Sequence, residues 1–449
     1  MNRSVHERAR ELLALAGPAF VLSWLALPAF ATEERSDSPI NLDAARQQFQ
    51  AAQEICGADG GRFWGVSLCG PIMFVDPQSR RVVANQKDGE GVLQEDGGVF
   101  TGSLPTSQNI ASTPTQWSGV LWSQIIWPLP DDLSRRDTLL AHDLFHRIQS
   151  RVPIPLQNES ANEHLDTLDG RYLMQLEWRA LTAALRCTTR PACHQAVSDA
   201  LVFRAARYQL FPSAAAEEKA LELNEGVAEY TGVSIGNRTH KAQVDATLFD
   251  LSAHVGDETF VRSFAYATGP AYGLLLDKYL PGWRQELRSA PSLNDLLQRA
   301  ANIPYPRKVN DAAAERAERY EGAKLRSVEL AREKKRQQIL AVNRAKFVDG
   351  PVLVIPLHHT NIQFDPRSLQ PLEKLGTVYP TLRISADWGV LEVRNGALLK
   401  PDWSAVSVVA PIHTGGTLEG DGWTLILKPN WTVISAARSG DFTLAGPPQ

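Results

Sequence analysis

Two histidines four residues apart are the clearest candidates for chemistry in this sequence. In the stretch LLAHDLFHRIQ, His142 and His146 are one helical turn apart, so both imidazoles project from one face and can bind one cation. Asp143 follows the first histidine, where a carboxylate can reach a water bound to that cation. Taken alone, this motif fits a metal site and an amphipathic helix with packing histidines equally well.

A second segment, LNEGVAEYTG, offers the third protein ligand that zinc needs beside an open position for water. Glu225 and Glu229 are four residues apart on a predicted helix, so one can bind metal while the other accepts the N–H of a ligating histidine. The alternative is a surface helix with two solvated glutamates. Gly226 favours the metal site, because a glycine inside a helix is unfavourable unless another element approaches closely.

These segments resemble the gluzincin metallopeptidases, the thermolysin-like and aminopeptidase-N-like group, in which an HExxH helix and a later Asn-Glu helix hold one zinc. By position, the resemblance implies Zn²⁺ bound by His142, His146 and Glu225. It also implies that Asp143 is the catalytic base and that Glu229 is the hydrogen-bond partner of a ligating histidine. The expected activity is hydrolysis of peptide bonds in a peptide or protein substrate.

A third segment, YATGPAYGLLLD, looks like the Tyr-x-x-Gly helix of the aminopeptidase-like branch. The resemblance implies that Tyr266 stabilises the oxyanion, with Tyr272 as the alternative. The three motifs together cover roughly residues 115 to 280. The chain has no Gly-x-Met-Glu-Asn segment, so the resemblance does not imply exopeptidase action.

Asp143 stands where the family carries glutamate. The two acids have similar intrinsic pKa values, about 3.9 and 4.3. They differ in reach by one methylene, and a misplacement of about 1 Å can lower a rate about a hundredfold. Two interpretations stay open. In the first, the helix lies closer to the metal-bound water, which offsets the shorter side chain, and the protein still hydrolyses peptides. In the second, the chain is a non-catalytic exported zinc-binding protein on a gluzincin scaffold, and its C-terminal β domain does the recognition.

The elements around these motifs predict an α+β fold. Residues 62–130 contain short aromatic or β-branched runs broken by Gly, Pro and Asp, which indicate strands, and residues 131–310 have mostly helical spacing. With the resemblance above, residues 40–310 are the expected zincin-like metallopeptidase domain, a mixed sheet followed by a mostly helical half. The helix that carries the histidines has three candidate N-cap residues, Asp131, Asp132 and Ser134.

Two further regions follow this domain. Residues 311–346 are rich in charge and poor in large apolar side chains, which predicts a solvated connecting helix. Residues 347–449 contain short strands that predict a C-terminal all-β sandwich or barrel. Asn395-Gly396 and Asp421-Gly422 are expected to form its hairpin turns.

The N-terminal segment has the pattern of a signal for export. Residues 1–31 contain positive charge, an apolar run and the small-x-small sequence Ala29-Phe30-Ala31, which together predict a secretory signal peptide. An uncleaved anchor is the alternative, although a glycine and two prolines inside the run favour removal. After signal removal we expect no stable membrane span, and we expect a periplasmic or secreted protein.

Export changes what the four cysteines can do, because an oxidising compartment lets them pair. Pairing of neighbours would join Cys56 to Cys69 and Cys187 to Cys193, the second bond tying a predicted helical hairpin. Cysteine ligation of a metal is disfavoured, since the chain contains no CxxC pair.

The overall composition narrows the classes of partner. The chain has 449 residues, 43% of them hydrophobic, and a formal net charge of -4. It is too long for one small core, and it lacks the concentrated basic composition that nucleic-acid binding requires, so no nucleic-acid partner is expected. Oligomeric state is not predicted. The remaining histidines beyond the signal segment look isolated or exposed and are assigned no site role: His164, His194, His240, His254, His358, His359 and His413.

Overall fold

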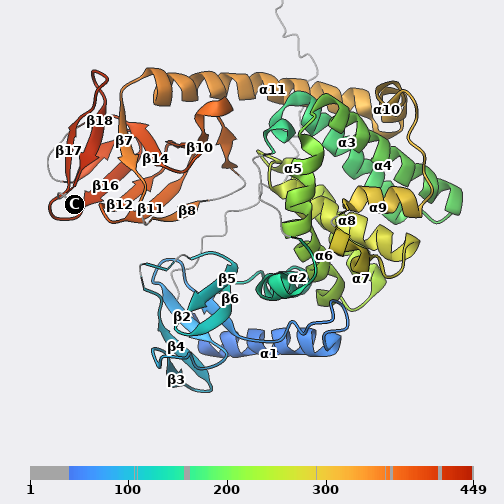
Figure 1. Ribbon diagram of the computed structural model, residues 1–449, viewed down its shortest axis with the longest axis horizontal. Coiled ribbons are helices and arrows are strands. Elements are labelled where there is room, and N and C mark those ends of the chain that lie inside the picture. The colour runs from blue at the N-terminus through green and yellow to red at the C-terminus, as the bar shows by residue number, and fades with distance from the viewer. Residues whose placement is uncertain are drawn as a thin grey trace, which may run out of the picture. The chain divides into compact units, whose positions relative to one another are not determined.

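The computed structural model describes residues 40–105, 107–108, 110–155, 162–289, 291–358, 360–364, 368–412 and 417–446. The protein has an N-terminal mixed sheet, a helical middle and a C-terminal region of two open sheets (Figure 1). This arrangement confirms the predicted α+β class. The predicted signal peptide, His359 and His413 lie outside the described residues.

The N-terminal part combines one helix with a six-stranded sheet. The bounds are α1 Leu42–Asp59, β1 Ile72–Val75, β2 Arg81–Ala84, β3 Gln94–Asp96, β4 Val99–Ser103, β5 Thr113–Trp117 and β6 Val120–Ile126. The strand order is β3-β4-β2-β1-β6-β5, in which β1 and β6 are parallel and the other neighbours antiparallel. The sheet is therefore mixed, as expected, whereas α1 is a helix that the sequence patterns did not predict.

Both faces of this sheet are buried at its strand β1. In β1, Phe74 points to the face covered by α1 and stacks on Phe49, with ring centroids 4.6 Å apart. Its neighbours Met73 and Val75 pack on the opposite face into a separate hydrophobic core, as the two-residue period of a strand requires. The first face also receives Leu144 of the following helix, so the sheet supports the element that carries the paired histidines.

The helical middle holds the candidate chemistry. Its elements are α2 Leu133–Ile148, α3 Leu168–Arg186, α4 Arg190–Leu210, α5 Ala214–Leu221, the π-helical turn η3 Glu222–Gly226, α6 Val227–Gly236, α7 His240–Ala253, α8 Ser263–Tyr279 and α9 Leu293–Ala300. Helix α6 packs closely on α2 at Gly232, where a Cβ atom would lie 2.6 Å from the carbonyl oxygen of Thr138. Only glycine permits this approach, which brings the chain around α6 toward the histidines.

Two disulfides staple the chain. Cys56 bonds Cys69 and so joins the end of α1 to the loop before β1, and Cys187 bonds Cys193 between α3 and α4. The Cα atoms of each pair are 5.2 Å apart. Disulfides of this kind are typical of proteins from oxidising compartments, which is compatible with the expected export.

The charged segment after α9 differs from the expected single solvated helix. It contains two helices, α10 Val309–Ala317 and α11 Gly322–Arg344, separated by a short 3₁₀ turn. One side of α11 is buried, because Glu329 is only 3% exposed and accepts hydrogen bonds from Arg171 and Gln175 of α3. Ion pairing with α3, which periodicity in one segment cannot reveal, explains why this face is charged and yet buried.

The C-terminal region is a sandwich-like pair of open sheets and not a closed barrel. Its strands are β7 Val352–Pro356, β8 Asn361–Phe364, β9 Gln370–Pro371, β10 Thr377–Tyr379, β11 Leu382–Ala386, β12 Gly389–Val393, β13 Ala397–Leu399, β14 Ala405–Val409, β15 Leu418–Gly420, β16 Trp423–Leu427, β17 Thr432–Ser435 and β18 Phe442–Ala445. The two sheets have the orders β17-β18-β7-β14-β13-β10-β9 and β15-β16-β12-β11-β8. Ile355 of the first sheet and Leu391 of the second share one hydrophobic core.

One of the two predicted hairpin turns is wrong. Asp421-Gly422 does connect β15 to β16, which pair through Gly420 and Trp423. Asn395-Gly396 instead connects β12 to β13, and these strands belong to different sheets. The Asn-Gly pair supplies the same sharp turn in both situations, so its local preference could not distinguish a hairpin from a crossing between sheets.

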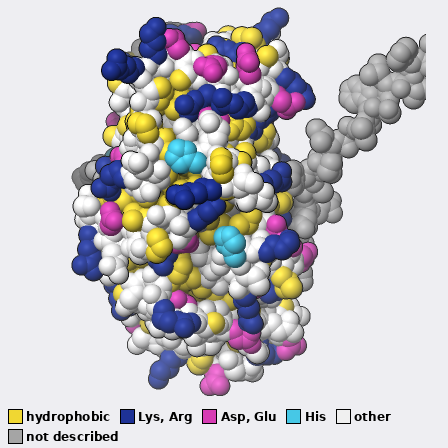
Figure 2. Space-filling model, turned by 90° about the vertical axis from the view of Figure 1, so that its right-hand side faces the viewer, with side chains coloured by type: hydrophobic (Ala, Val, Ile, Leu, Met, Phe, Trp, Pro, Cys, Tyr) yellow, Lys and Arg dark blue, Asp and Glu magenta, His cyan; other side chains and the backbone are white. Residues whose placement is uncertain are grey.

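Charged side chains of both signs lie interspersed on the face of the molecule seen in Figure 2. Within the described part of the chain, no helix combines the length and apolar character needed to cross a bilayer.

Candidate metal centre

Helix α2 presents its two histidines on a buried face. Asp132, one of the three predicted caps, is its N-cap and accepts a hydrogen bond from the backbone N–H of Arg135 at 2.9 Å. His142 and Asp143 are buried, and His146 lies one turn further along the same face. The i, i+4 spacing places both imidazoles on one face of α2, as expected, and their Nε2 atoms lie 2.9 Å apart.

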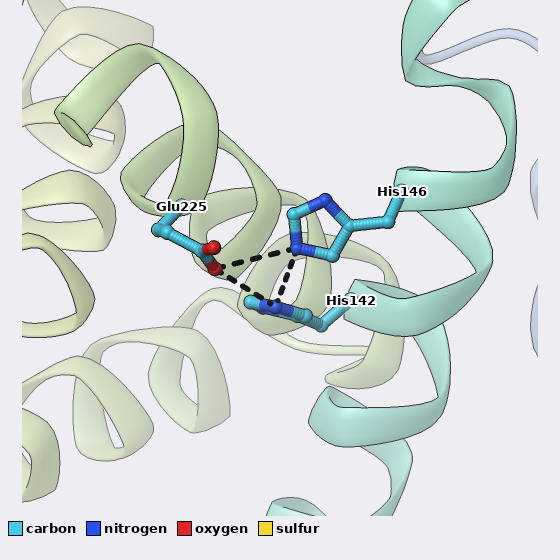
Figure 3. Close-up of side chains that lie close together, drawn as sticks. All are labelled: His142, His146 and Glu225. Carbon is cyan, nitrogen blue, oxygen red and sulfur yellow. Dashed lines mark hydrogen bonds and ion pairs between the residues drawn. The ribbon is translucent and has the colours of Figure 1, made fainter. Parts of the chain in front are cut away.

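The third candidate ligand comes from the π-helical turn η3. Glu225 Oε2 lies 3.4 Å from His146 Nε2 and 3.7 Å from His142 Nε2, so three ligand atoms converge from two elements (Figure 3). Zinc bonds of about 2.0–2.2 Å at tetrahedral angles separate neighbouring ligand atoms by about 3.4 Å. The spacing of these atoms fits one metal ion. Two imidazoles and one carboxylate suit zinc and other divalent transition metals.

The Nδ1 atoms of both histidines face acceptors that orient the rings. Glu229 Oε2 lies 2.7 Å from His142 Nδ1, which is an ion-pair distance, although the geometry is not that of a hydrogen bond. His146 Nδ1 lies 2.8 Å from the side-chain oxygen of Gln149. An acceptor at Nδ1 favours the tautomer that leaves the Nε2 lone pair free for a metal.

Gln149 is a site residue that the motifs did not single out. Besides facing His146, its Nε2 donates to the backbone carbonyl of Asn224 at 3.0 Å, in the turn that carries Glu225. One side chain thus links a ligating histidine to the turn of the third ligand. The available signal was its position three residues after His146, on the same helical face.

Asp143 is buried, and within the described part of the chain one of its carboxylate oxygens lacks a hydrogen-bond partner. Its side chain is 2% exposed, and its Oδ2 atom has no hydrogen-bond partner among the described residues. Burial raises the pKa of Asp143 to about 6, although His142 and His146 act in the opposite direction. A buried carboxylate oxygen without a donor is available to accept a proton or hydrogen bond from water, which is what a general base at this position requires.

The electrostatic state of His142 depends on the same carboxylates. Burial alone would lower the pKa of His142, but Glu225 and Glu229 raise it well above its ordinary value. Negative charge therefore exceeds what the neutral imidazoles can balance, and a cation at their Nε2 atoms would supply the missing positive charge.

Tyr266 contacts the candidate metal ligands, whereas Tyr272 does not. The Tyr266 hydroxyl donates to Glu225 Oε2 at 2.8 Å, and its ring stacks on His142 at 5.7 Å between centroids. Arg262 contacts the other oxygen of Glu225 at 3.3 Å. Tyr272 is buried elsewhere and donates to Glu177 at 2.8 Å.

Two histidines that looked isolated in the sequence have partners in the structure. His254 Nδ1 lies 2.8 Å from Asp257, and its ring is 6.3 Å from that of Tyr266. His164 is buried, with its Nε2 2.8 Å from Glu218. His194, His240 and His358 are exposed.

Comparison of the chain with protein-family models, with curated protein sequences and with solved structures gave no match. The function therefore has to be argued from the geometry of the site itself.

Proposed function

We propose that the protein is an exported zinc-dependent peptidase of the gluzincin type, with Zn²⁺ bound by His142, His146 and Glu225. The observation that carries the proposal is the convergence of two Nε2 atoms and one carboxylate oxygen within 3.7 Å of one another. Three protein ligands leave a fourth position for water, which distinguishes a catalytic zinc site from a closed structural one.

Bound zinc would lower the pKa of a coordinated water toward about 7 and polarise the carbonyl of the scissile peptide. Asp143 accepts the proton of the attacking water and later delivers it to the leaving amine. Its burial and the unpaired Oδ2 support this role.

Glu229 and Gln149 hold the two imidazoles in the orientation that the metal needs. Tyr266 stabilises the developing oxyanion by redirecting its hydroxyl from Glu225 Oε2 to the substrate oxygen. Its contact with a ligand atom places that hydroxyl next to the cation position, which supports the role. The substrate is a peptide or protein outside the cytoplasm, as the two disulfides and the predicted export signal suggest.

The test is peptide-library cleavage with purified protein whose bound zinc is quantified, beside Asp143→Asn and Glu225→Ala. We expect one zinc per chain in the wild type, cleavage of a subset of peptides, and loss of cleavage by at least about a hundredfold in Asp143→Asn. Glu225→Ala should lose the zinc as well. Asp137→Asn is the matched control, since it makes the same chemical change on α2 at a half-buried carboxylate that pairs with Arg136 and is not among the candidate ligands.

One zinc per chain with no cleavage of any peptide between pH 5 and 9 would contradict the peptidase and leave the non-catalytic zinc-binding protein. Absence of zinc from the wild type would contradict both. Asp143→Glu tests the effect of the shorter side chain directly. If the position of the helix has adapted to Asp, the longer Glu should crowd the metal-bound water and lower activity. If it has not, Glu should reach the water better and raise activity.

A further inference from the structure

The turn that carries Glu225 is an unusual piece of backbone. Residues Glu222–Gly226 form a π-helical turn inserted between α5 and α6. A π turn has i→i+5 hydrogen bonds, it is rare, and it changes the directions in which successive side chains point. Here Glu222 points into the buried interior, and Glu225 points to the histidines of α2.

Contacts hold this turn along its whole length. Gln149 donates to the carbonyl of Asn224 on the side of α2. On the side of α8, the chain passes so close that a Cβ atom on Gly226 would lie 3.2 Å from the Cα of Gly269. A Cβ atom on Gly269 would lie 2.2 Å from the carbonyl oxygen of Gly226, so neither glycine can be replaced without moving the backbone.

The carboxylate of Glu222 is the buried anchor of the turn. The side chain is 1% exposed, and three donors saturate it. Arg204 binds both oxygens, with Nη2 at 2.6 Å from Oε1 and Nη1 at 2.8 Å from Oε2. Thr268 of α8 donates to Oε1 at 2.6 Å. A bidentate guanidinium contact fixes a carboxylate in direction as well as in place.

Arg204 is itself held by a larger buried group. It donates to Glu177 of α3 at 2.8 Å, and Arg207 of α4 connects Glu177 to Glu218 of α5. We call these five fully buried residues the ion-pair network: Glu177, Arg204, Arg207, Glu218 and Glu222. The network joins α3, α4, α5 and the π turn in one rigid arrangement.

We infer that Glu222, held by Arg204 and Thr268, is a positioning residue that sets where the Glu225 carboxylate meets the metal. This inference rests on the proposed metal site. It assigns to the buried side of the π turn a role in ligand geometry, which acts through the backbone of the two residues between Glu222 and Glu225. Glu222 touches neither metal nor substrate, so it acts only through Glu225.

The test uses Co²⁺ alone as the probe, because its visible spectrum reports coordination geometry independently of activity. Thr268→Val removes one donor to Glu222 at nearly constant volume. We expect Co²⁺ affinity to fall about tenfold, within the range for residues behind metal ligands, and the spectrum of the Co²⁺ protein to change. Thr268→Ser keeps the hydroxyl and should restore both. If the added methyl of valine prevents folding, Thr268→Ala leaves room and carries the same expectation.

Tyr272→Phe is the matched control, since it removes a hydroxyl donated to Glu177 and leaves Glu222 untouched. It should lower thermal stability as Thr268→Val does, yet keep wild-type Co²⁺ affinity and spectrum. Wild-type affinity and spectrum in a folded Thr268→Val or Thr268→Ala protein would overturn the inference and leave the metal site standing. Equal losses of affinity in Tyr272→Phe would also overturn it, by assigning the effect to general loosening. Failure of the wild type to bind Co²⁺ would contradict the metal site itself.

Discussion

Two charged clusters lie on opposite sides of the π turn Glu222–Gly226, and they are satisfied in different ways. In the ion-pair network, each of the three glutamates is paired with arginine at 2.6–2.8 Å. In the cluster around the histidines, Asp143 keeps an unpaired oxygen, and two imidazole nitrogens face each other at 2.9 Å.

The difference separates a structural cluster from a binding one. Burying charges is tolerated when each has a partner, and the network meets this condition with its own residues. The histidine cluster meets it less completely, because Glu225, Glu229 and Asp143 lie around two imidazoles and Arg262 contacts Glu225 at 3.3 Å. An incomplete cluster of this kind is where a cation and a water belong.

The largest effect should follow from breaking the network. Arg204→Met removes the cation between Glu177 and Glu222, and loss of one partner of a buried pair costs about 3–5 kcal/mol. Urea unfolding of metal-free protein measures this. Glu225→Gln on the histidine side, measured in the same way, should cost much less, because it removes one of several crowded carboxylates. Equal costs would remove the distinction between the two clusters.

Asp143 should destabilise the metal-free fold at neutral pH. Its pKa is raised from its ordinary 3.8 to about 6, which corresponds to about 3 kcal/mol. For an acid with a raised pKa in the folded state, the penalty is absent below about pH 4 and complete above about pH 6. Asp143→Asn should therefore stabilise the protein in chelator at pH 7 and have little effect at pH 4.

Denaturation curves of Asp143→Asn and the wild type at pH 4 and pH 7 measure this difference, with Asp137→Asn as control. A lower free energy of unfolding for Asp143→Asn than for the wild type at pH 7 would contradict the interpretation that the buried Asp143 carboxylate destabilises the fold.

The ion-pair network should show the opposite dependence of stability on pH. Burial would raise the pKa of Glu218, but Arg207 holds it well below its ordinary range. That glutamate therefore stabilises the fold above its unfolded pKa, and the stabilisation is lost as pH falls.

Metal addition should stabilise the wild type next most strongly. At a zinc concentration 100 times the Kd, a ligand that binds only the folded state adds about 2.7 kcal/mol. Thermal unfolding with and without zinc measures the shift, and chelator should reverse it. Arg204→Met, if folded, should retain part of the shift, whereas Glu225→Ala should show none. A shift of full size in Glu225→Ala would place the metal elsewhere.

The smallest effect concerns Gln149. Gln149→Leu removes the acceptor at His146 Nδ1 and the donor to Asn224, and loss of such an outer partner lowers metal affinity about 10- to 100-fold. Competition with a chromogenic chelator measures the affinity. Gln149→Glu should preserve the acceptor and bind metal more tightly than the leucine variant. Affinity unchanged in both would mean that Gln149 only packs.

Much of the site was predictable because its parts obey local rules. His142 and His146 are one turn apart, Asp132 caps their helix, and Glu225 and Glu229 follow in an Asn-Glu segment. The order of strands, helices and strands along the chain was likewise enough to predict an α+β fold. Periodicity and capping depend on residues only a few positions apart, so both can be read directly from the sequence.

Other features could not be predicted because they depend on partners far along the chain. Glu329 was predicted to be solvated, but it is buried and accepts a hydrogen bond from Arg171. His164 was predicted to be isolated, but its Nε2 lies 2.8 Å from Glu218, 54 residues further along the chain. Asn395-Gly396 has the preferences of a hairpin turn and yet crosses between sheets. In these cases the residue types and their spacing were read correctly, but the role of each residue depends on contacts with other segments that the local sequence does not reveal.

The sequence by itself determined which groups could bind a cation, since residue type and helical spacing place two imidazoles on one face. The sequence motifs also indicated Tyr266, with Tyr272 as the alternative. Only the tertiary structure decided that the π turn brings Glu225 to the histidines and that Tyr266 contacts it, whereas the buried Tyr272 donates to Glu177 of the ion-pair network. The physical reason is that ligand geometry depends on how α2, α6 and α8 pack, and close approach at glycines such as Gly232 and Gly269 sets that packing over long separations in the chain.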